Sequence, residues 1–213
     1  RLILYENSNM EVSLISHIQE PRLSRVVQDM NYYHWELLLD ETFVLSTSIE
    51  DVVINERETH YSINLVSLES GEVSVIHKSF KPEIFPEDVK ETTIDKYRQS
   101  ANLETGNPRM QEILKRNYEQ VLKVFTGIEY KTPIKTILAD RHFLFVFTTQ
   151  KNEAGGIFTD VFDTSKERYI SSSYMPLIPR VIKNGFAYIS AENIDGMQVI
   201  KKYKIDPAVY RIN

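Results

Sequence analysis

The residues of this chain that could carry acid–base or metal chemistry are few and widely spaced. The chain contains no cysteine, which excludes disulfides, thiolate zinc sites and cysteine nucleophiles. It contains five histidines, and no two of them have the HxH or HxxxH spacing of a metal site: His17, His34, His60, His77 and His142. His17 and His77 fall in predicted outermost strands and His142 in a predicted turn, where a polar side chain is expected. We therefore predict no catalytic residue and no metal ligand among them.

Four acids are the remaining candidates for calcium binding or paired-carboxylate catalysis: Asp160, Asp163, Glu192 and Asp195. Asp163 and Asp195 lie in turn contexts, where an aspartate accepts hydrogen bonds from nearby backbone N–H groups. The sequence has no GxSxG, P-loop, dinucleotide-binding or HExxH motif. The glycine pair in EAGGIF, from Glu153, is not followed by a helical pattern, so it does not predict a phosphate-binding loop.

The densest aromatic cluster is NYYHWELLLDE, residues 31–41, which contains the only tryptophan. It lies just ahead of a predicted innermost strand, so Tyr32, Tyr33, His34 and Trp35 could line one face of the fold. Flat aromatic surfaces of this kind stack on sugars and peptides. The alternative is that Trp35 and one tyrosine pack between neighbouring sheets. Under the first interpretation these four residues form the predicted binding site.

Composition limits the partners of the chain. Its formal net charge is −5 and its lysines and arginines are mixed with acids, which argues against binding to a phosphate backbone. The longest uninterrupted apolar run is Phe143–Phe147, far short of the roughly 20 residues of a membrane-spanning helix. We therefore expect neither a nucleic-acid partner nor a membrane span.

The elements that must position these residues follow a repeat. Period-two alternation of apolar and polar residues, bounded by turn residues, predicts short strands along most of the chain. One repeated phrase is a turn followed by phenylalanine and an apolar strand, as in DETFVLSTS, DRHFLFVFTT and KNGFAYISAE. Its phenylalanines, Phe43, Phe143 and Phe186, are separated by 100 and 43 residues. The shorter interval matches the roughly 40–50 residues of one four-stranded propeller blade.

A helical insertion accounts for the longer interval. From Pro108, PRMQEILKRNYEQVLKVF places apolar residues at three- and four-residue steps, which predicts one amphipathic helix. Asn107 supplies an N-cap, Pro108 suits the first turn and Gly127 ends the pattern. A shorter helix is predicted around residues 89–100. The apolar stripe of the longer helix would pack on the sheet edges, or alternatively form a lid or a groove for a partner helix.

The ends of the chain fall in the middle of the repeat. EVSLISH, from Glu11, returns as EVSVIHK, from Glu72, and ERYISSS, from Glu167, is a looser copy. LILYENSNME, from Leu2, aligns with INLVSLESGE, from Ile63, so the chain would begin at the third strand of one blade. It would finish at the third strand of another blade, in VIKKYKIDP. Because unpaired sheet edges invite aggregation, we expect these residues to be the C-terminal half of a longer propeller.

Several of these phrases carry a resemblance to a known family. TPIKTILADRHFLFVFTT, VFD with a turn and YI, IKNGFAYI, and the closing KYKI resemble the last two blades of bacterial six-bladed β-propellers of the NHL-like or TolB-like type. The resemblance covers the C-terminal 85 residues and, more loosely, residues 32–82. Two departures stand out: Lys166 occupies a turn position where the family usually has glycine, and the segment from Thr47 to Ser62 expands one blade.

The resemblance implies a secreted or periplasmic bacterial protein, often associated with the cell surface. Related propellers include metal-dependent lactonases and lyases, whose chemistry depends on carboxylates and amides that point into the central channel from several blades. The motifs shared here are turn-and-strand signatures, which bear on the fold and not on activity.

We predict an all-β fold of about three blades of a six-bladed β-propeller with an α-helical insertion. Residues 1–83 and 128–213 would form blades, and residues 84–127 the insertion. The predicted function is a non-enzymatic binding or scaffold module without a cofactor, which engages a protein, peptide or glycan through its loop faces. The remaining blades would come from the same or a companion chain, and the expected location is the periplasm or extracellular surface of a bacterium. The alternative is a hydrolase or lyase that uses a divalent metal, such as calcium, in the central channel.

Overall fold

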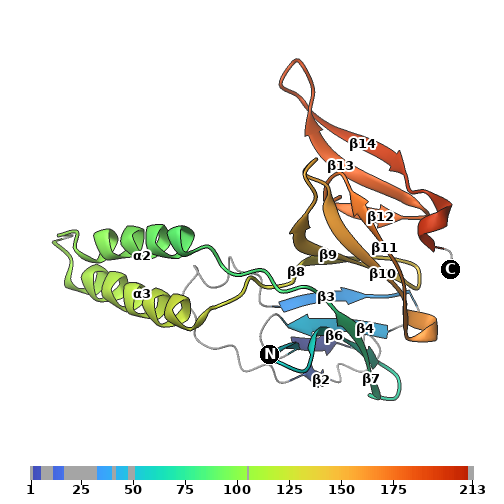
Figure 1. The fold of residues 1–213 in the computed structure, drawn as a ribbon, viewed down its shortest axis with the longest axis horizontal. Coiled ribbons are helices and arrows are strands. Elements are labelled where there is room, and N and C mark those ends of the chain that lie inside the picture. Colours follow the sequence, from blue (N-terminus) through green and yellow to red (C-terminus); the bar gives the residue numbers. More distant parts are fainter. Residues whose placement is uncertain are drawn as a thin grey trace. The chain divides into compact units, whose positions relative to one another are not determined.

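The computed structural model describes residues 2–5, 12–16, 33–39, 42–47, 51–104 and 106–210. Within these ranges, side chains are described from residue 34 onward, apart from that of Thr47. The chain divides into two compact units: Arg1–Tyr32 with Pro82–Lys131, and Tyr33–Lys81 with Thr132–Asn213. Figure 1 shows their helices and strands, coloured along the sequence.

The first unit contains a β-hairpin and two helices: β1 (Leu2–Tyr5), β2 (Val12–Ser16), α2 (Glu87–Ala101) and α3 (Pro108–Gly127). β1 and β2 pair antiparallel. The predicted helix from Pro108 to Gly127 is confirmed, and so is its cap. The Asn107 side chain accepts hydrogen bonds from the backbone N–H groups of Arg109 and Met110. These are two of the N–H groups that the start of a helix leaves without an intrahelical partner.

α3 packs against α2 in a helical hairpin (Figure 1). Its stripe is most deeply buried at Val121 and Phe125, and the rings of Phe125 and Phe85 meet edge to face with their centroids 5.7 Å apart. At the other end of the hairpin, Gln111 Nε2 donates to the carbonyl of Ala101. The stripe thus has a partner that the sequence did not suggest, the helix α2. No helix in the described residues has the length and apolar character needed to cross a membrane.

The second unit is built from three antiparallel sheets, which we number I to III. Sheet I contains β3 (Tyr33–Leu37), β4 (Thr42–Thr47), β5 (Val52–Ile54), β6 (Thr59–Ser67) and β7 (Val73–Ser79). Sheet II contains β8 (Ile134–Asp140), β9 (Phe143–Lys151), β10 (Ile157–Asp163) and β11 (Arg168–Met175). Sheet III contains β12 (Val181–Lys183), β13 (Phe186–Glu192) and β14 (Gln198–Lys204). Two short 3-10 helices complete the unit, η1 (Thr164–Lys166) and η2 (Pro207–Tyr210).

Each sheet is a meander in which strands pair in chain order. Sheet I follows β3-β4-β6-β7. The short strand β5 is the exception to chain order: β5 and β4 both pair with the same edge of β6, β5 at its first residues and β4 at its last. Sheet II follows β8-β9-β10-β11 and sheet III β12-β13-β14. The prediction of short antiparallel sheets interrupted by helices is therefore confirmed, and the chain is mostly β-structure.

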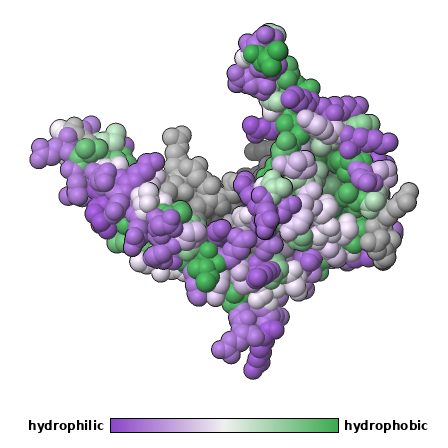
Figure 2. All heavy atoms as spheres, turned by 45° about the horizontal axis from the view of Figure 1, so that its top comes forward, coloured by the Kyte–Doolittle hydropathy of each residue, from purple (hydrophilic) through white to green (hydrophobic). Residues whose placement is uncertain are grey.

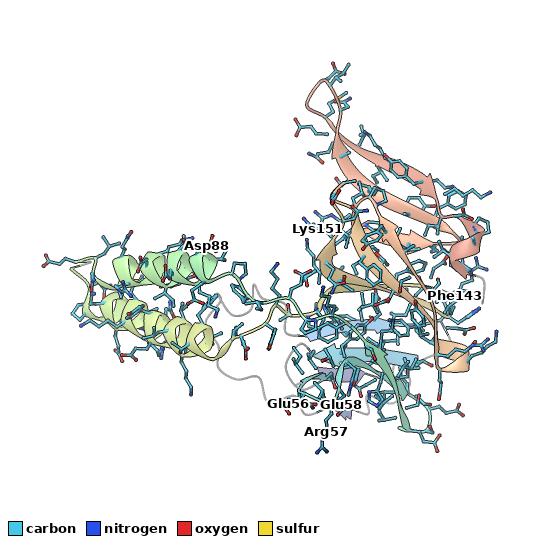
Figure 3. The ribbon with its side chains drawn as sticks, in the orientation of Figure 1. Glu56, Arg57, Glu58, Asp88, Phe143 and Lys151 are labelled. Atoms are coloured by element: carbon cyan, nitrogen blue, oxygen red, sulfur yellow. The ribbon has the colours of Figure 1, made fainter. Side chains whose placement is uncertain are left out.

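Sheet II lies between sheets I and III. β8 neighbours both β3 and β12, and an apolar cluster fills the space on each side of sheet II. Leu144 and Val146 belong to the cluster shared with sheet I, whereas Phe145 and Phe147 belong to the cluster shared with sheet III. Successive side chains of a strand point to opposite faces, so burial of both faces explains the uninterrupted apolar run of β9. Figure 3 shows the side chains of the unit, with Phe143 and Lys151 marking the two ends of β9.

The phenylalanines that defined the repeat are not all equivalent. Phe143 and Phe186 each open the second strand of a sheet, directly after a two-residue turn. In sheet I the N–H of Leu38 donates to the carbonyl of Thr42, so three residues separate the paired ends instead of two. Thr42 therefore takes the position that Phe143 and Phe186 have in the other sheets. Phe43 lies one residue further along its strand. Since a one-residue offset moves a side chain to the other face of a sheet, the alignment through Phe43 was wrong by one residue.

The turns between the third and fourth strands of sheets I and II have the same length. Residues 67–72 of sheet I and 163–168 of sheet II form matching turns, each with four residues between the paired ends. The left-handed position of this turn is Gly71 in sheet I, with φ 71°, and Glu167 in sheet II, with φ 49°. Within this chain, Glu167 is therefore the counterpart of Gly71.

Candidate functional site

Of the four residues predicted as a binding site, only His34 and Trp35 have described side chains, and these two lie on opposite faces of a strand. Tyr32 lies outside the described residues, and Tyr33 is described only by its backbone, at the start of β3. His34 and Trp35 follow each other in β3, so they point to opposite faces of sheet I. The Trp35 side chain is 56% exposed and stacks against Phe43 with the ring centroids 6.1 Å apart. His34 is only 6% exposed and its ring is on the face toward sheet II.

His34 and Glu36 lie on the same face of β3 and both have a shifted pKa. Burial lowers the pKa of His34 from 6.5 to about 4, against the opposing effect of a hydrogen bond to the backbone of Ile134. His34 Nε2 is the one buried side-chain nitrogen or oxygen in the described part of the chain that has no hydrogen-bond partner. Burial raises the pKa of Glu36, although backbone hydrogen bonds at Ala139 and Leu37 oppose it. Both shifts favour the neutral form, and such pairs occur at functional sites.

The other histidines do not converge on a metal position. His17 lies outside the described residues, and His142 is in the turn before Phe143. The rings of His60 and His77, on β6 and β7, meet edge to face with their centroids 4.7 Å apart, and Ser62 Oγ lies 2.9 Å from His77 Nδ1. Among the residues whose side chains are described, no three histidines or acids are arranged to hold a metal ion.

Asp160 links sheet I to sheet II. Its side chain is 1% exposed and accepts hydrogen bonds from Tyr61 Oη, at 2.6 Å, and from Ser172 Oγ. Lys78 Nζ lies 4.0 Å from its Oδ1 and also over the ring of Tyr169, 4.5 Å from the centroid. Burial, followed by the nearby carboxylate, raises the pKa of Tyr61 well above its ordinary value, so the phenol remains a donor. Two of these contacts, with Tyr61 and Lys78, join sheet II to sheet I, and the bond from Ser172 lies within sheet II.

The remaining predicted acids have local roles or are exposed. Asp163 Oδ1 accepts from the backbone N–H of Lys166 at 3.2 Å, as predicted, and from Ser165 Oγ at 2.6 Å, so this acid stabilises its own turn. Glu192 and Asp195 are exposed at the β13–β14 connection.

Asp140, which sequence reasoning missed, links sheets II and III. It is buried and accepts hydrogen bonds from the backbone N–H groups of Asn184 and Gly185, each at 2.7 Å, and from Tyr210 Oη at 3.0 Å. These bonds fix the β12–β13 turn against the end of β8. Burial, followed by the Asp140 carboxylate, raises the pKa of Tyr210. A usable signal was present in the sequence, because an acid that directly ends an apolar strand must find donors if it is buried.

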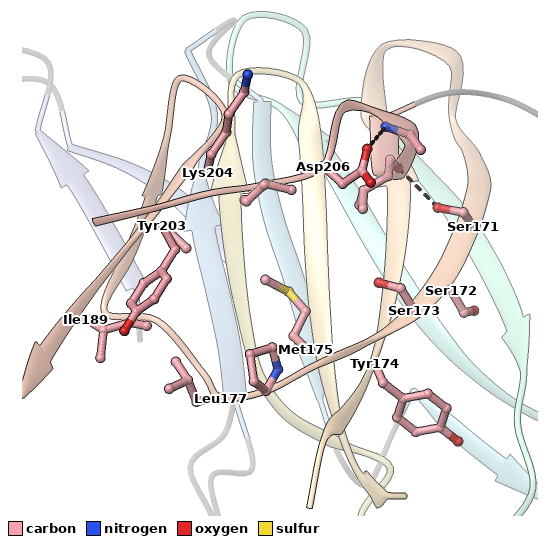
Figure 4. A pocket seen from close by; sticks show the side chains of 15 residues that line it. Ser171, Ser172, Ser173, Tyr174, Met175, Leu177, Ile189, Tyr203, Lys204 and Asp206 are labelled. Atoms are coloured by element: carbon pink, nitrogen blue, oxygen red, sulfur yellow. Dashed lines mark hydrogen bonds between the residues drawn. The ribbon is translucent and has the colours of Figure 1, made fainter. Parts of the chain in front are cut away.

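A groove of about 730 Å³ lies between β11 and sheet III (Figure 4). Its walls are mainly apolar and include Met175, Leu177, Ile189 and Tyr203. Ser171 lies at one end, where its Oγ donates to the carbonyl of Val209 at 3.1 Å. This bond holds η2 against β11, so the last described residues close that end of the groove. The volume is within the usual range of ligand sites, roughly 300–1,000 Å³.

The β13–β14 hairpin beside the groove carries several large exposed apolar side chains: Ile194, Met197, Ile200 and Tyr203. Figure 2 shows hydrophobic atoms at the tip of this hairpin, uppermost in the view, among hydrophilic ones. Sequence reasoning did not find this surface, because the groove combines residues 171–177, 187–189 and 203–209, and none of these segments has an unusual composition.

A comparison of the sequence with known protein families, with curated proteins and with solved structures finds no match. The site is therefore interpreted from its geometry.

Proposed function

We propose that this chain is a non-enzymatic binding or scaffold module made of β-propeller-type blades, and that the groove between β11 and sheet III holds its protein, peptide or glycan partner. The observation that carries the proposal is the groove itself, which is mainly apolar, open to solvent and supplied with a few hydroxyl groups. This combination is typical of sites that bury an apolar partner and orient it with a small number of polar contacts.

The arrangement of the sheets supports the propeller part of the proposal. In a propeller, four-stranded meanders pack face to face with their first strands nearest the axis. Sheets I to III are meanders, they pack in chain order, and the first strands β3, β8 and β12 are neighbours. The two end faces of this stack carry exposed apolar side chains, Trp35 and Leu37 on sheet I and Val181 and Ile200 on sheet III. Such faces would accept further blades from the same or a companion chain, in the bacterial periplasmic or extracellular setting that the resemblance implies.

The experiment is a selection against the groove. A random peptide display library and a glycan array are applied to the chain and to two variants. Ile189→Lys places a charge in the groove, and Ile200→Lys makes the same change on the opposite face of sheet III. We expect ligands that bind the chain and the Ile200→Lys variant but not the Ile189→Lys variant. Ligands that bind all three proteins equally, or no ligand at all, would refute the proposal.

A second function is favoured by one observation at the innermost strand of sheet I. An imidazole with one nitrogen bonded to the backbone and the other free, as in His34, has the form of a metal-ligating histidine. Glu36 lies on the same face, although the described residues add no third ligand. A hydrolase or lyase using a divalent metal in the central channel would build on this pair. Calorimetric titration with Zn²⁺ and Ca²⁺ tests it: uptake that is lost in His34→Gln supports the second function, and no uptake removes it.

A further inference from the structure

We infer that the groove accepts an extended segment of another protein, with acidic and apolar residues in alternation, which adds to β14 as the fourth strand of sheet III. The inference rests on the proposed function, because it names the class of partner that the groove would hold.

The backbone of β14 has a free edge in the described structure. Sheets I and II each have a fourth strand paired antiparallel with the third, whereas β14 pairs only with β13. The N–H of Ile205 donates to the carbonyl of Gly185, and the carbonyl of Met197 accepts from Asn193. Backbone groups of an antiparallel strand alternate between its two edges. The N–H and C=O groups that point away from β13 are therefore those at residues 198, 200, 202 and 204.

The groove lies where the side chains of an added strand would point. In the space between sheets I and II, the fourth strand β7 contributes Ile76 to the apolar cluster and Lys78 to the contact with Asp160. A strand on β14 would contribute side chains to the next space in the same way, and there the structure has a groove lined by Met175 and Ile189 instead. Apolar residues at every second position of the added strand would fill it.

The described residues that follow β14, up to Tyr210, do not supply this strand. After Ile205 the chain turns into η2, and the bond from Ser171 Oγ to the Val209 carbonyl directs it into the end of the groove and not back along β14. In the described structure the edge of β14 is therefore unpaired, and we propose that a separate polypeptide pairs with it.

Charge determines which segment fits. β14 carries Lys201, Lys202 and Lys204 and no acid, in a chain whose formal net charge is −5. Lysines on a sheet edge oppose pairing with neutral or basic strands, so they select against unrelated partners. An acidic strand instead gains attraction at the same positions, which also speeds its association.

The test uses fluorescein-labelled peptides and fluorescence anisotropy. The probe is the acidic peptide EVEVEIEVS, with the basic peptide KVKVKIKVS and the proline-interrupted peptide EVEPEIEVS as controls. We expect the acidic peptide to bind. The basic peptide and raised salt should each reduce the affinity about tenfold or more, because both remove the attraction to the lysines of β14. The proline-interrupted peptide should bind about threefold or more weakly, because it loses a backbone hydrogen bond.

A pair of variants isolates the backbone of β14. Ile200→Pro removes an N–H that points away from β13 and leaves the bonds to β13 intact, as proline permits on an edge strand. Ile200→Ala removes the same side chain, which is 78% exposed, but keeps the N–H. We expect Ile200→Pro, which loses one hydrogen bond, to weaken binding of the acidic peptide about threefold or more and Ile200→Ala to leave it unchanged, with circular dichroism showing that both variants keep their strands.

Three outcomes would overturn the inference. The first is equal binding of the acidic and basic peptides, or binding of neither. The second is equal affinity of Ile200→Pro and Ile200→Ala. If in that case ligands still lose binding to Ile189→Lys, the groove remains a binding site and only strand addition is refuted. The third is concentration-dependent dimerisation in sedimentation that Ile200→Pro abolishes, because a second copy of the chain would then be the occupant.

Discussion

Replacing Tyr61 with phenylalanine would isolate one hydrogen bond in the link between sheets I and II. Tyr61 Oη donates to Asp160 over 2.6 Å, and both side chains are buried. Phenylalanine keeps the ring that packs near Phe80 and Phe162, so the substitution removes the donor without opening a sizeable cavity. A hydrogen bond to a charged group contributes roughly 1.5–3 kcal/mol, and a buried carboxylate that loses one cannot turn to water. We expect the free energy of unfolding to fall by about 2–3 kcal/mol.

Urea unfolding, followed by far-ultraviolet circular dichroism, measures this loss. Tyr169→Phe is the matched control, because its hydroxyl also lies 2.6 Å from a network atom, Ser172 Oγ, but the side chain is partly exposed. The control should change the free energy by about 0.5 kcal/mol or less. In a double-mutant cycle, Tyr61→Phe with Asp160→Asn should show a coupling energy of about 1 kcal/mol or more. A Tyr61→Phe effect as small as that of the control would refute our account of the link.

Three further substitutions test other parts of the fold. Burial lowers the pKa of His34 from 6.5 to about 4, so between these values the unfolded chain binds a proton that the folded chain does not. The free energy of unfolding should therefore fall by up to about 3 kcal/mol as the pH drops from 6.5 to 4. Urea unfolding at several pH values measures this fall, and His34→Gln should remove it. A variant that loses as much stability over this pH range as the unmodified chain would contradict the prediction. Glu167 has a left-handed backbone, with φ 49°, so Glu167→Gly should stabilise the protein by about 0.5–1 kcal/mol in thermal unfolding. Gly71→Ala places a side chain at the matching position, with φ 71°, and should destabilise the protein. Stability changes of the opposite sign in the two variants would count against the match between the turns. Asp140→Ala leaves two N–H groups and the Tyr210 hydroxyl without their acceptor. The free energy of unfolding in urea should fall by about 3–4 kcal/mol, and Asp140→Asn should recover part of the loss. A loss below about 1 kcal/mol would mean that other contacts hold the turn.

The sequence predicted those elements whose cause is local. The start and end of α3 follow from a capping side chain, a first-turn proline and an apolar stripe, all within residues 107–127, and the structure reproduces each of them. The phrase DRHFLFVFTT likewise predicted a turn and a strand, and the structure has β9 there; its burial on two faces was not predicted. In both cases the residues that determine the element are the ones that form it.

Register could not be obtained in the same way. Alternation gives the two faces of a strand but not which face meets which neighbour, and that choice depends on the length of the preceding turn. The turn before β4 has one residue more than those before β9 and β13, so matching the phenylalanines placed Phe43 on the wrong face. Backbone bonds at Leu38 and Thr42 decide this, and neither residue has a strong turn signal.

The link between sheets I and II was beyond sequence reasoning for a related reason. Tyr61 and Asp160 are 99 residues apart, so the sequence marked Asp160 as a candidate acid but gave no sign of its partner. The aromatic cluster at residues 32–35 attracted attention because it is local, yet alternation alone sends His34 and Trp35 to opposite faces. A buried acid in an apolar strand, as in IFTDVFD, was the more informative signal, because it requires donors from another element.

Sheet III is the less buried of the two sheets that border the proposed binding groove. Among its strands only Ile182 and Ala187 are buried, whereas β9 and β10 of sheet II are buried along most of their length. Sheet III therefore gains less stabilisation from burial than sheet II, and weakly stabilised parts are where binding elements are commonly found. A strand added to β14 would cover the groove and pair the edge in one step, so the free energy of binding would also stabilise sheet III. The same three-strand architecture that weakens this sheet thereby gives the proposed partner a position to bind.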